Sequence, residues 1–391
     1  MTAPAFGRAL RPLWDLDPDG IFLNHGSFGA CPKVVIAAQA RIRAAMEAQP
    51  DVFFRRRVSL RDGPDTELRA AAARLARFVG CGDGTLAFVE NATAGVQAAL
   101  CAVDLAPGDR VLITSHTYNA VRLMVEARCR ETGAVPVVAE LPLPADAGEI
   151  VARFDAAGEG VRVAILDHIT SPTAIVMPLE RIVPRLKERG ALVIVDGAHA
   201  VGHIPLDVPA TGADWYTSNA HKWLYAPRGS AFLYAAPGVA PRTHPLVTSH
   251  YVEQGFPLSF DWVGTRDYSG WLAVPAAIDF HQGIDAEGLS AHVRRLLDLA
   301  TATLEGLGAV SIAPMALCAR MRSFALPQRR PAADDDVREL VGRLWERDRI
   351  QSMAVKFGSR LLLRVSGQAY VGEEDVRALG EALGRDGWPG R

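Results

Sequence analysis

The sequence predicts an α/β protein in which a large domain holds a parallel β-sheet and a smaller domain follows it. Short β-branched runs alternate with helix-like runs through the middle of the chain, which is typical of parallel strands joined by right-handed crossovers. The run Leu192–Val195 is apolar on both faces, as expected for a strand covered on both sides. The length of 391 residues suits one large domain plus a smaller one.

The large domain is expected to alternate strands and helices from residue 86 to residue 196. The expected strands are Leu86–Glu90, Val111–Ser115, Val135–Ala139, Val163–Asp167 and Leu192–Asp196. The helix patterns between them are Ala94–Val103, Ala120–Thr132 and Leu179–Arg189. Run length separates the two classes, because strands are short and helices need about ten residues or more.

A small α+β domain is expected after about residue 279, where the pattern changes. Its helix patterns are Ala286–Leu307, Asp336–Trp345 and Glu373–Leu383, and its strands are Met321–Ala325 and Arg360–Val365. The amphipathic pattern Pro32–Ala48 is expected to form a helix that packs against this domain. We therefore divide the chain into an N-terminal segment packing on the small domain (1–50), a large domain (51–280) and a small C-terminal domain (281–391).

Composition and charge argue against several kinds of partner. The net charge is −2 and the charged residues are interleaved, so neither nucleic acid nor a membrane surface is an expected partner. The sequence contains no run of about 18 uncharged apolar residues, so we expect no transmembrane helix. Met1–Trp14 lacks the order of a signal peptide, so a cytoplasmic location is expected. The five cysteines form no CxxC pair and no metal-type spacing with histidine, and no metal is expected.

Two residues carry the strongest chemical signal. Asp196 ends the most apolar strand, where ligands bind in open α/β sheets, although a plain helix N-cap is the alternative. Lys222 follows in a stretch flanked by Trp215, Tyr216 and Trp223. A lysine by itself is usually a surface group, but these aromatic neighbours should desolvate the amine and lower its pKa. A neutral amine is what Schiff-base formation needs.

The pairing of a carboxylate with a buried lysine fits pyridoxal 5'-phosphate (PLP). PLP works as an electron sink when its pyridine nitrogen stays protonated, and a carboxylate such as Asp196 favours that charged form. Lys222 would hold the cofactor and then take the α-proton of the substrate. The segment Glu90–Gly95 follows an expected strand and opens an expected helix, so its N–H groups and the Thr93 hydroxyl could bind the phosphate, unless Thr93 is a plain cap.

These motifs resemble class V PLP enzymes of the aspartate-aminotransferase fold, and above all the isopenicillin N epimerase-like proteins, a group that includes C–S lyases. The resemblance runs through nearly the whole chain. It rests on Phe22–Gly29, Phe53-Phe54, Asn91–Val96, Asp167–Thr173, Asp196–His199, His221-Lys222, Phe260–Asp267 and Leu363–Ser366. It implies fold type I, with a mostly parallel seven-stranded sheet in the large domain and a small α+β C-terminal domain.

The resemblance also implies which residues hold the cofactor. Lys222 would be the Schiff-base lysine, and Asp196 would pair with the pyridine nitrogen. His116 would stack on the ring, with Tyr118 as the runner-up, and Tyr118 has the alternative role of a general acid or base. The other contacts would come from His199 and Ser171 near the ring 3-hydroxyl, and from the backbone of Ala92 with Thr93, Asn219 and His221 at the phosphate.

Further residues are implied for the substrate and for a second subunit. Arg364 would clamp the substrate α-carboxylate, because a guanidinium suits a planar anion. Asn24, His25 and Arg56 would line the substrate mouth. Thr265 would reach the phosphate site of the neighbouring subunit, which implies a homodimer.

Departures from the family patterns bear on the reaction. Cysteine desulfurases carry a nucleophilic cysteine shortly before the carboxylate-binding arginine, whereas Val355–Arg360 contains none. In isopenicillin N epimerases we expect a threonine where His25 stands and an acidic residue where Ser115 stands. Both differences weaken the case for the isopenicillin N substrate.

Removal of an α-proton by Lys222 leaves two main outcomes. In β-elimination from a cysteine conjugate or sulfoxide, the Cβ substituent leaves and pyruvate and ammonia form, with help from Tyr118 or a histidine. Epimerisation needs a second acid on the opposite face, which the sequence does not identify, so elimination is the leading expectation. An epimerase or racemase, an aminotransferase and a PLP-binding protein without turnover are the alternatives. A metal hydrolase is a further alternative, but its possible ligands fit no standard metal spacing: Asp167, His168, Asp196, His199 and His221.

Overall fold

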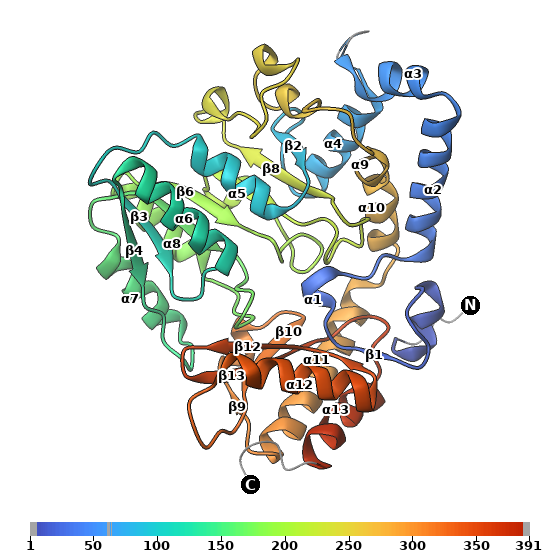
Figure 1. Cartoon of the computed structure of the whole chain (residues 1–391), viewed down its shortest axis with the longest axis vertical. Helices are drawn as coiled ribbons and strands as arrows, with labels where there is room; N and C mark the ends of the chain where they lie inside the picture. The colour runs from blue at the N-terminus through green and yellow to red at the C-terminus, as the bar shows by residue number, and fades with distance from the viewer. Residues whose placement is uncertain (1–5, 61–62, 64, 386–391) are drawn as a thin grey trace.

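The computed structural model describes residues 6–60, 63 and 65–385. The first five residues of Met1–Trp14, on which the expected location partly rests, lie outside this range. A large α/β part and a smaller α+β part are distinguishable along the chain (Figure 1). Within the described residues, no helix combines the length and the apolar composition that crossing a bilayer requires.

The large part is built on a seven-stranded sheet in the order β2-β8-β7-β6-β5-β3-β4. β8 runs antiparallel to both its neighbours, and the other neighbouring pairs are parallel. This confirms the mostly parallel sheet. The strands are β2 (Leu86–Val89), β3 (Arg110–Thr114), β4 (Val135–Ala139), β5 (Val161–Asp167), β6 (Leu192–Asp196), β7 (Trp215–Ser218) and β8 (Ala231–Ala235).

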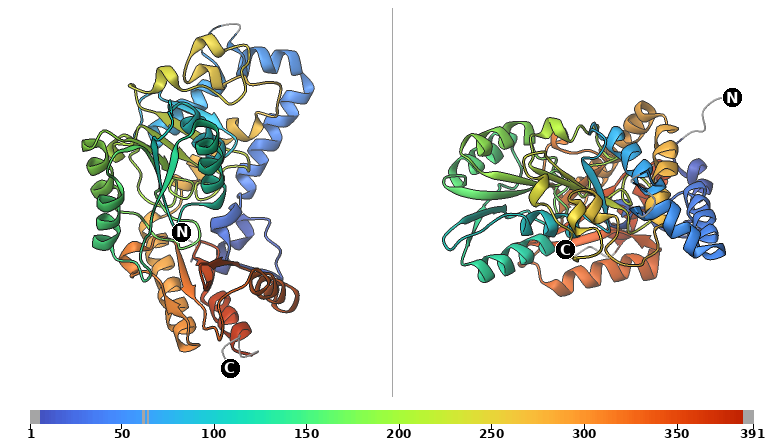
Figure 2. Two further views of the ribbon diagram at one scale, coloured as in Figure 1. Left: turned by 60° about the vertical axis from the view of Figure 1, so that its left-hand side comes forward. Right: turned by 90° about the horizontal axis from the view of Figure 1, so that it is seen from above.

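Helices cover both faces of this sheet (Figure 2). Alternate residues of β6 show it: Val193 and Val195 lie in one apolar core, and Ile194 lies in another on the opposite face. The first core also receives α4 (Glu67–Phe78), α7 (Ala147–Ala157), α8 (Leu179–Glu188) and α10 (Val274–Gln282). The second receives α5 (Ala92–Cys101) and α6 (Asn119–Thr132). Burial on both faces explains the continuous apolar run of this strand.

The smaller part contains an antiparallel sheet in the order β12-β13-β10-β9. Its strands are β9 (Val310–Ser311), β10 (Met321–Ala325), β12 (Met353–Phe357) and β13 (Arg360–Ser366), and its helices are α11 (Ala286–Gly306), α12 (Asp334–Asp348) and α13 (Glu373–Arg385). The N-terminal strand β1 (Ile21–Phe22) pairs in parallel with β11 (Ile350–Gln351). Trp14 and Leu23, from the described part of the N-terminal segment, are buried in the apolar core of the small part together with Leu296 and Leu363.

The predicted packing of the Pro32–Ala48 helix is wrong. This segment forms α2 (Lys33–Ala48), which contacts α10 and α9 (Ser269–Leu272). Its buried Val35 and Met46 belong to the core of the large part. An amphipathic period identifies the apolar side of a helix, but it does not identify the neighbour that covers that side. The three domain boundaries themselves stay a prediction.

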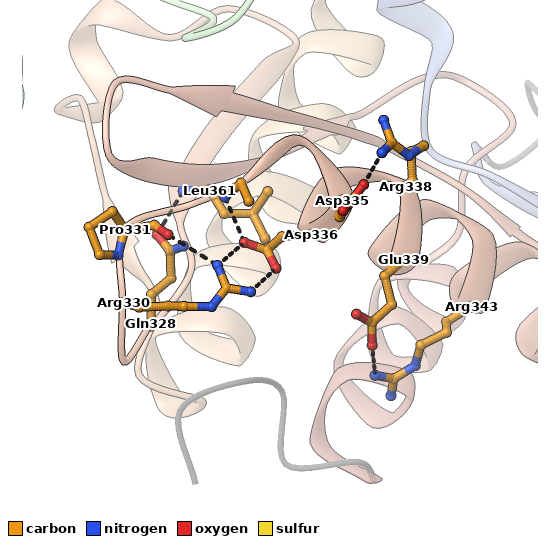
Figure 3. A network of polar contacts seen from close by, with 10 residues as sticks. Gln328, Arg330, Pro331, Asp335, Asp336, Arg338, Glu339, Arg343 and Leu361 are labelled. Carbon is orange, nitrogen blue, oxygen red and sulfur yellow. Dashed lines mark hydrogen bonds and ion pairs between the residues drawn. The ribbon is translucent and has the colours of Figure 1, made fainter.

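Hydrogen bonds at the start of α12 hold the preceding loop in place (Figure 3). Asp336 accepts a hydrogen bond from the backbone N–H of Ala333 at 2.7 Å, and its two carboxylate oxygens accept from Arg330 at 2.9 and 2.6 Å. The N–H of Leu361 on β13 donates to Gln328 at 2.8 Å. The loop before α12 is thus tied both to the helix start, where a carboxylate is favourable, and to the sheet.

Candidate active site

A cavity of about 400 Å³ lies where β5 and β6 end and α5 begins. The carboxyl ends of strands are the expected ligand position in such a sheet. Predicted site residues make up most of the lining: Ala92, Thr93, Tyr118, Ser171, Asp196, His199, Asn219, His221 and Lys222, joined by Ser27, Asn91, Asp167 and Ala198. The volume is that of a small-molecule site.

The N-terminus of α5 forms one wall of the cavity. The first N–H groups of a helix have no intrahelical acceptor. Here side-chain oxygens take two of them: Asn219 accepts from Ala92 at 2.8 Å and Asn91 accepts from Ala94 at 2.9 Å. Thr93 lies between these two residues and lines the cavity. Its N–H and hydroxyl are therefore suited to an anionic group.

A glycine lets α5 approach the sheet this closely. A Cβ added to Gly95 would collide with the hydroxyl oxygen of Thr217 on β7. Thr217 in turn donates that hydroxyl to the carbonyl of Phe232 on β8 at 2.7 Å, so it has little freedom to move. The start of α5 is held at its position by this tight contact.

Two carboxylates end neighbouring strands of the sheet. Asp167 on β5 and Asp196 on β6 are register partners, and each side chain is 5% exposed. Burial raises the pKa of both groups, and repulsion by Asp196 raises the pKa of Asp167 further. Two full charges about 5 Å apart, the spacing of neighbouring strands, would repel by about 3 kcal/mol at an effective dielectric of about 20.

Lys222 is the buried lysine of the cavity. Burial is the main cause that lowers the pKa of its amine to about 7, with Arg364 adding to the effect and the two carboxylates opposing it. The chain has three other lysines, Lys33, Lys187 and Lys356, and all three are exposed. They form ion pairs with Asp15, Asp214 and Asp334. The scarcity of lysine was a further sequence signal for Lys222.

Arg364 lies directly behind the cavity wall. It is 1% exposed, and its guanidinium donates to the carbonyl of Ser171 at 2.6 Å, to the hydroxyl of Ser27 at 3.0 Å and to the side-chain oxygen of Asn24 at 3.4 Å. All three acceptors are neutral, and its buried Nε has no hydrogen-bond partner among the described residues. Burial lowers its pKa to about 10. A buried cation with neutral acceptors is costly, so this site favours an anion.

The structure places His116 outside the cavity lining, and its role as the first stacking residue stays a prediction. Its side chain is fully buried, with Nδ1 3.0 Å from the hydroxyl of Thr173 and the ring edge-on to Phe357 at 4.7 Å. Burial lowers its pKa to about 4. Tyr118, the runner-up, does line the cavity, and its side chain is 45% exposed. The two residues lie in an irregular turn, where spacing does not tell which side chain faces inward.

Three other predicted residues lie away from the cavity surface. His25 is buried behind Lys222: its Nε2 lies 3.0 Å from the Lys222 carbonyl, and its Nδ1 lies 2.7 Å from the hydroxyl of Tyr370. It therefore supports the backbone of the lysine. Arg56 is exposed on the surface and does not line the cavity. It lies in the π-helical turn η2 (Phe54–Val58), which follows α3 (Pro50–Phe53). Thr265 is also exposed, next to Arg266, which pairs with Glu90 at 2.5 Å.

Four residues of the lining were not among the predicted site residues: Ser27, Asn91, Asp167 and Ala198. Ser27, in the short helix α1 (His25–Phe28), contacts both the cavity and Arg364. Asp167 ends a strand just as Asp196 does, so the strand-end argument applied to both. Among the described residues, no group of three or more His, Cys, Asp or Glu side chains is arranged to hold a metal ion.

These residues fit PLP in the chemistry of their donors. The cavity combines a buried amine with a lowered pKa, buried carboxylates at strand ends and a helix N-terminus with a hydroxyl. These are the groups needed for an aldehyde, a ring nitrogen and a phosphate. Fold and site together define a PLP-dependent enzyme of fold type I.

Comparison with known proteins identifies the family. The family described as "Aminotransferase class-V" matches residues 32–342. The isopenicillin N epimerase of Streptomyces clavuligerus is 33% identical over 390 residues, which cover 94% of this chain and 95% of that protein. An L-cysteine desulfhydrase of Arabidopsis thaliana is 31% identical over 402 residues, which cover 92% and 86% respectively. The chain belongs to the class V aminotransferase family.

A solved structure agrees on the fold. The apo structure of a cysteine desulfurase from Thermococcus onnurineus NA1 matches with a TM-score of 0.81 and 18% sequence identity, over 98% of this chain and 99% of that one. At this identity the likeness concerns the fold. It confirms fold type I for the whole arrangement of large and small parts.

Proposed function

We propose that this protein is a C–S lyase that removes sulfur from cysteine or an S-substituted cysteine by β-elimination. With L-cysteine, the Cα–H and Cβ–S bonds break and water is consumed, and the products are pyruvate, ammonia and hydrogen sulfide. When bound, PLP supplies the electron sink that stabilises negative charge at Cα. Lys222 holds the cofactor through its amine and takes the α-proton.

The buried amine of Lys222, in a cavity whose described lining contains no cysteine, is the observation that carries this proposal. A pKa of about 7 makes the amine available as a nucleophile and base near neutral pH. None of the described residues that line the cavity is a cysteine, so a persulfide route has no nucleophile there. Elimination needs one base, whereas epimerisation needs a second acid on the opposite face. The likeness to a named L-cysteine desulfhydrase supports the same choice.

The other residues divide between cofactor and substrate. We propose that Asp196 faces the ring nitrogen, that Tyr118 stacks on the ring, and that Ser171 and His199 contact the 3-hydroxyl. The phosphate is assigned to Ala92, Thr93, Asn219 and His221. Arg364 binds the substrate carboxylate, because it is a buried cation whose protein partners are neutral. Asn24 orients that guanidinium.

Some expected residues act only in an assembly. Thr265 is exposed beside an ion pair that joins its loop to Glu90, at the start of the segment leading into α5. We propose that a homodimer brings Thr265 to the phosphate site of the second subunit. Arg56 would reach the substrate mouth in the same way. A cytoplasmic location stays a prediction.

Epimerisation is the second candidate. The isopenicillin N epimerase likeness covers 95% of that protein, and Tyr118 offers a second proton donor at the cavity wall. An aminotransferase and a binding protein without turnover remain outcomes of the same experiment.

Isotope labelling separates these reactions. The holoenzyme is incubated in D₂O with L-cysteine, S-alkyl cysteines, cysteine sulfoxides and unreactive L-amino acids. The proposal expects pyruvate and a sulfur product from the cysteine compounds, and none from Lys222→Ala. Deuterium at Cα with a D-isomer and no pyruvate would identify an epimerase instead, and transfer of the amino group to a keto acid would identify an aminotransferase.

A further inference from the structure

The second carboxylate of the cavity, Asp167, has no part in the function proposed above. It is the last residue of β5 and the register partner of Asp196, which is the last residue of β6. The N–H of His168 donates to the carbonyl of Asp196 at 2.8 Å, so the two strands stay paired to their ends. Register partners on parallel strands project to the same face of a sheet. Both side chains line the same cavity and are nearly inaccessible.

The surroundings of the two carboxylates differ. The N–H of Ala198 donates to Asp196 at 2.9 Å, and the charge of Lys222 lowers the pKa of that carboxyl. Asp167 experiences the repulsion of Asp196, and the hydroxyl of Thr117 and the backbone N–H groups of Tyr118 and Asp167 counteract it. These groups are neutral, and the charge of Lys222 interacts with both carboxylates but more strongly with Asp196. A proton shared by the pair is therefore more stable on Asp167.

We propose that the Asp167–Asp196 pair carries one proton, that Asp167 holds it, and that Asp167 is a positioning residue for the cofactor cavity. Asp167 joins the end of β5 to the turn that carries Tyr118, and it leaves Asp196 as the single ionised carboxylate of the pair. We assign Asp167 no contact with the reacting atoms. This inference rests on the proposed roles of Asp196 and Tyr118, but it does not depend on which reaction follows.

The test compares Asp167→Asn with Asp196→Asn, because asparagine has the shape of a protonated carboxyl. Asp167→Asn is expected to bind PLP within about threefold of the wild-type dissociation constant, whereas Asp196→Asn loses tenfold or more. An Asp167→Asn protein that loses PLP affinity as strongly as Asp196→Asn would overturn the proposal. Neither readout involves turnover, so a wrong substrate or reaction class leaves the result interpretable.

The pH dependence of the melting temperature of the holoenzyme gives a second readout. A carboxyl whose pKa is higher when folded adds stability that is complete below its unfolded pKa of about 4 and is lost as pH rises through the folded pKa. The amide that replaces this carboxyl in Asp167→Asn does not titrate. The melting temperature of Asp167→Asn minus that of wild type should therefore rise between pH 5 and the folded pKa, by about 2 °C per pH unit.

One control variant and one independent measurement complete this test. Asp104 is exposed, so Asp104→Asn makes the same Asp-to-Asn exchange at the surface and is the control variant. A difference that stays flat with pH for Asp167→Asn would mean that Asp167 is already ionised, and the proposal fails. If Asp167→Asn does not fold, infrared spectra of the wild-type protein decide. A protonated carboxyl band at neutral pH, protected from exchange in D₂O, is expected, and its absence contradicts the shared proton.

Discussion

The amine of Lys222 and the imidazole of His199 lie 3.3 Å apart, measured from Nζ to Nε2. The other ring nitrogen of His199, Nδ1, is 3.4 Å from the indole nitrogen of Trp223. An indole N–H can only donate, so Nδ1 accepts and the proton of the neutral ring lies on Nε2. Burial lowers the pKa of His199 well below its usual value, which keeps the ring neutral. His199 therefore donates to Lys222, and only a neutral amine can accept.

Loss of the His199 donor should make Lys222 harder to deprotonate. His199→Ala removes a hydrogen bond to the neutral amine and admits water, and both changes raise the pKa of Lys222. The rate at which the apoenzyme rebinds PLP should rise with pH through about 7 in the wild type, because the neutral amine attacks the aldehyde. In His199→Ala the midpoint should move upward by roughly half to one pH unit.

A histidine away from the site provides the control for this shift. His244 is exposed, and His244→Ala should rebind PLP with the wild-type pH profile. An unchanged midpoint in His199→Ala would show that the imidazole does not influence the amine.

Tyr118 and His116 should differ in their effect on the cofactor. Tyr118→Ala removes an aromatic wall of the cavity, and we expect PLP to bind about tenfold more weakly, because a stacked ring contributes roughly 0.5–1.5 kcal/mol beyond its buried area. His116→Phe keeps a ring against Phe357 and should change the affinity by less than about threefold. Fluorescence titration of the apoenzyme with PLP measures both. The reverse order of effects would restore His116 as the stacking residue.

Arg364 should govern the binding of carboxylated substrates. Arg364→Met keeps most of the side-chain volume but removes the charge, and KM should rise about 10–100-fold. Gly26→Ala should act in the same direction but less strongly, because its Cβ would lie 3.1 Å from Nη2 of Arg364. Arg360→Met, at the exposed start of the same strand, is the matched control. Steady-state kinetics with a KM unchanged in Arg364→Met would mean that the carboxylate binds elsewhere.

A methyl group at Gly95 should disturb the start of α5. Gly95→Ala forces the helix away from Thr217 on β7, so we expect a loss of about 1–3 kcal/mol in the free energy of unfolding and weaker binding of phosphate and PLP. Gly342→Ala places the same methyl in open space within α12 and should stabilise by about 0.5–1 kcal/mol. Denaturant unfolding of the two variants compares them directly. Equal effects would mean that the close approach at Gly95 is unimportant.

The central parallel strands could be predicted from the sequence because burial on both faces makes each of them a continuous apolar run. β6 was predicted at its observed bounds, and Asp196 at its end followed from the general position of ligands. The strand β7 was not predicted, because Trp215–Ser218 has four residues and its aromatic side chains equally suit a pocket wall. The helix α4 was also missed. The local patterns in these two segments are too short or too mixed to assign a helix or a strand.

Contacts between distant segments account for the remaining differences. The buried position of His25 behind Lys222 depends on Tyr370, which is 345 residues further along the chain. The packing of α2 on α10 likewise depends on contacts between segments that are far apart in the sequence. Motif resemblance predicted substrate-binding roles for Arg364 and His25. It did not reveal that Arg364 lies behind the cavity wall or that His25 contacts the backbone of Lys222.

The most direct test of the account is to locate the cofactor on the protein. The holoenzyme is reduced with borohydride, digested and examined by mass spectrometry, which fixes the cofactor to the residue that carries it. The chain has four lysines, so the outcome is unambiguous. We expect the added mass on the peptide that contains Lys222. Modification of Lys33, Lys187 or Lys356, or of no lysine at all, would contradict it.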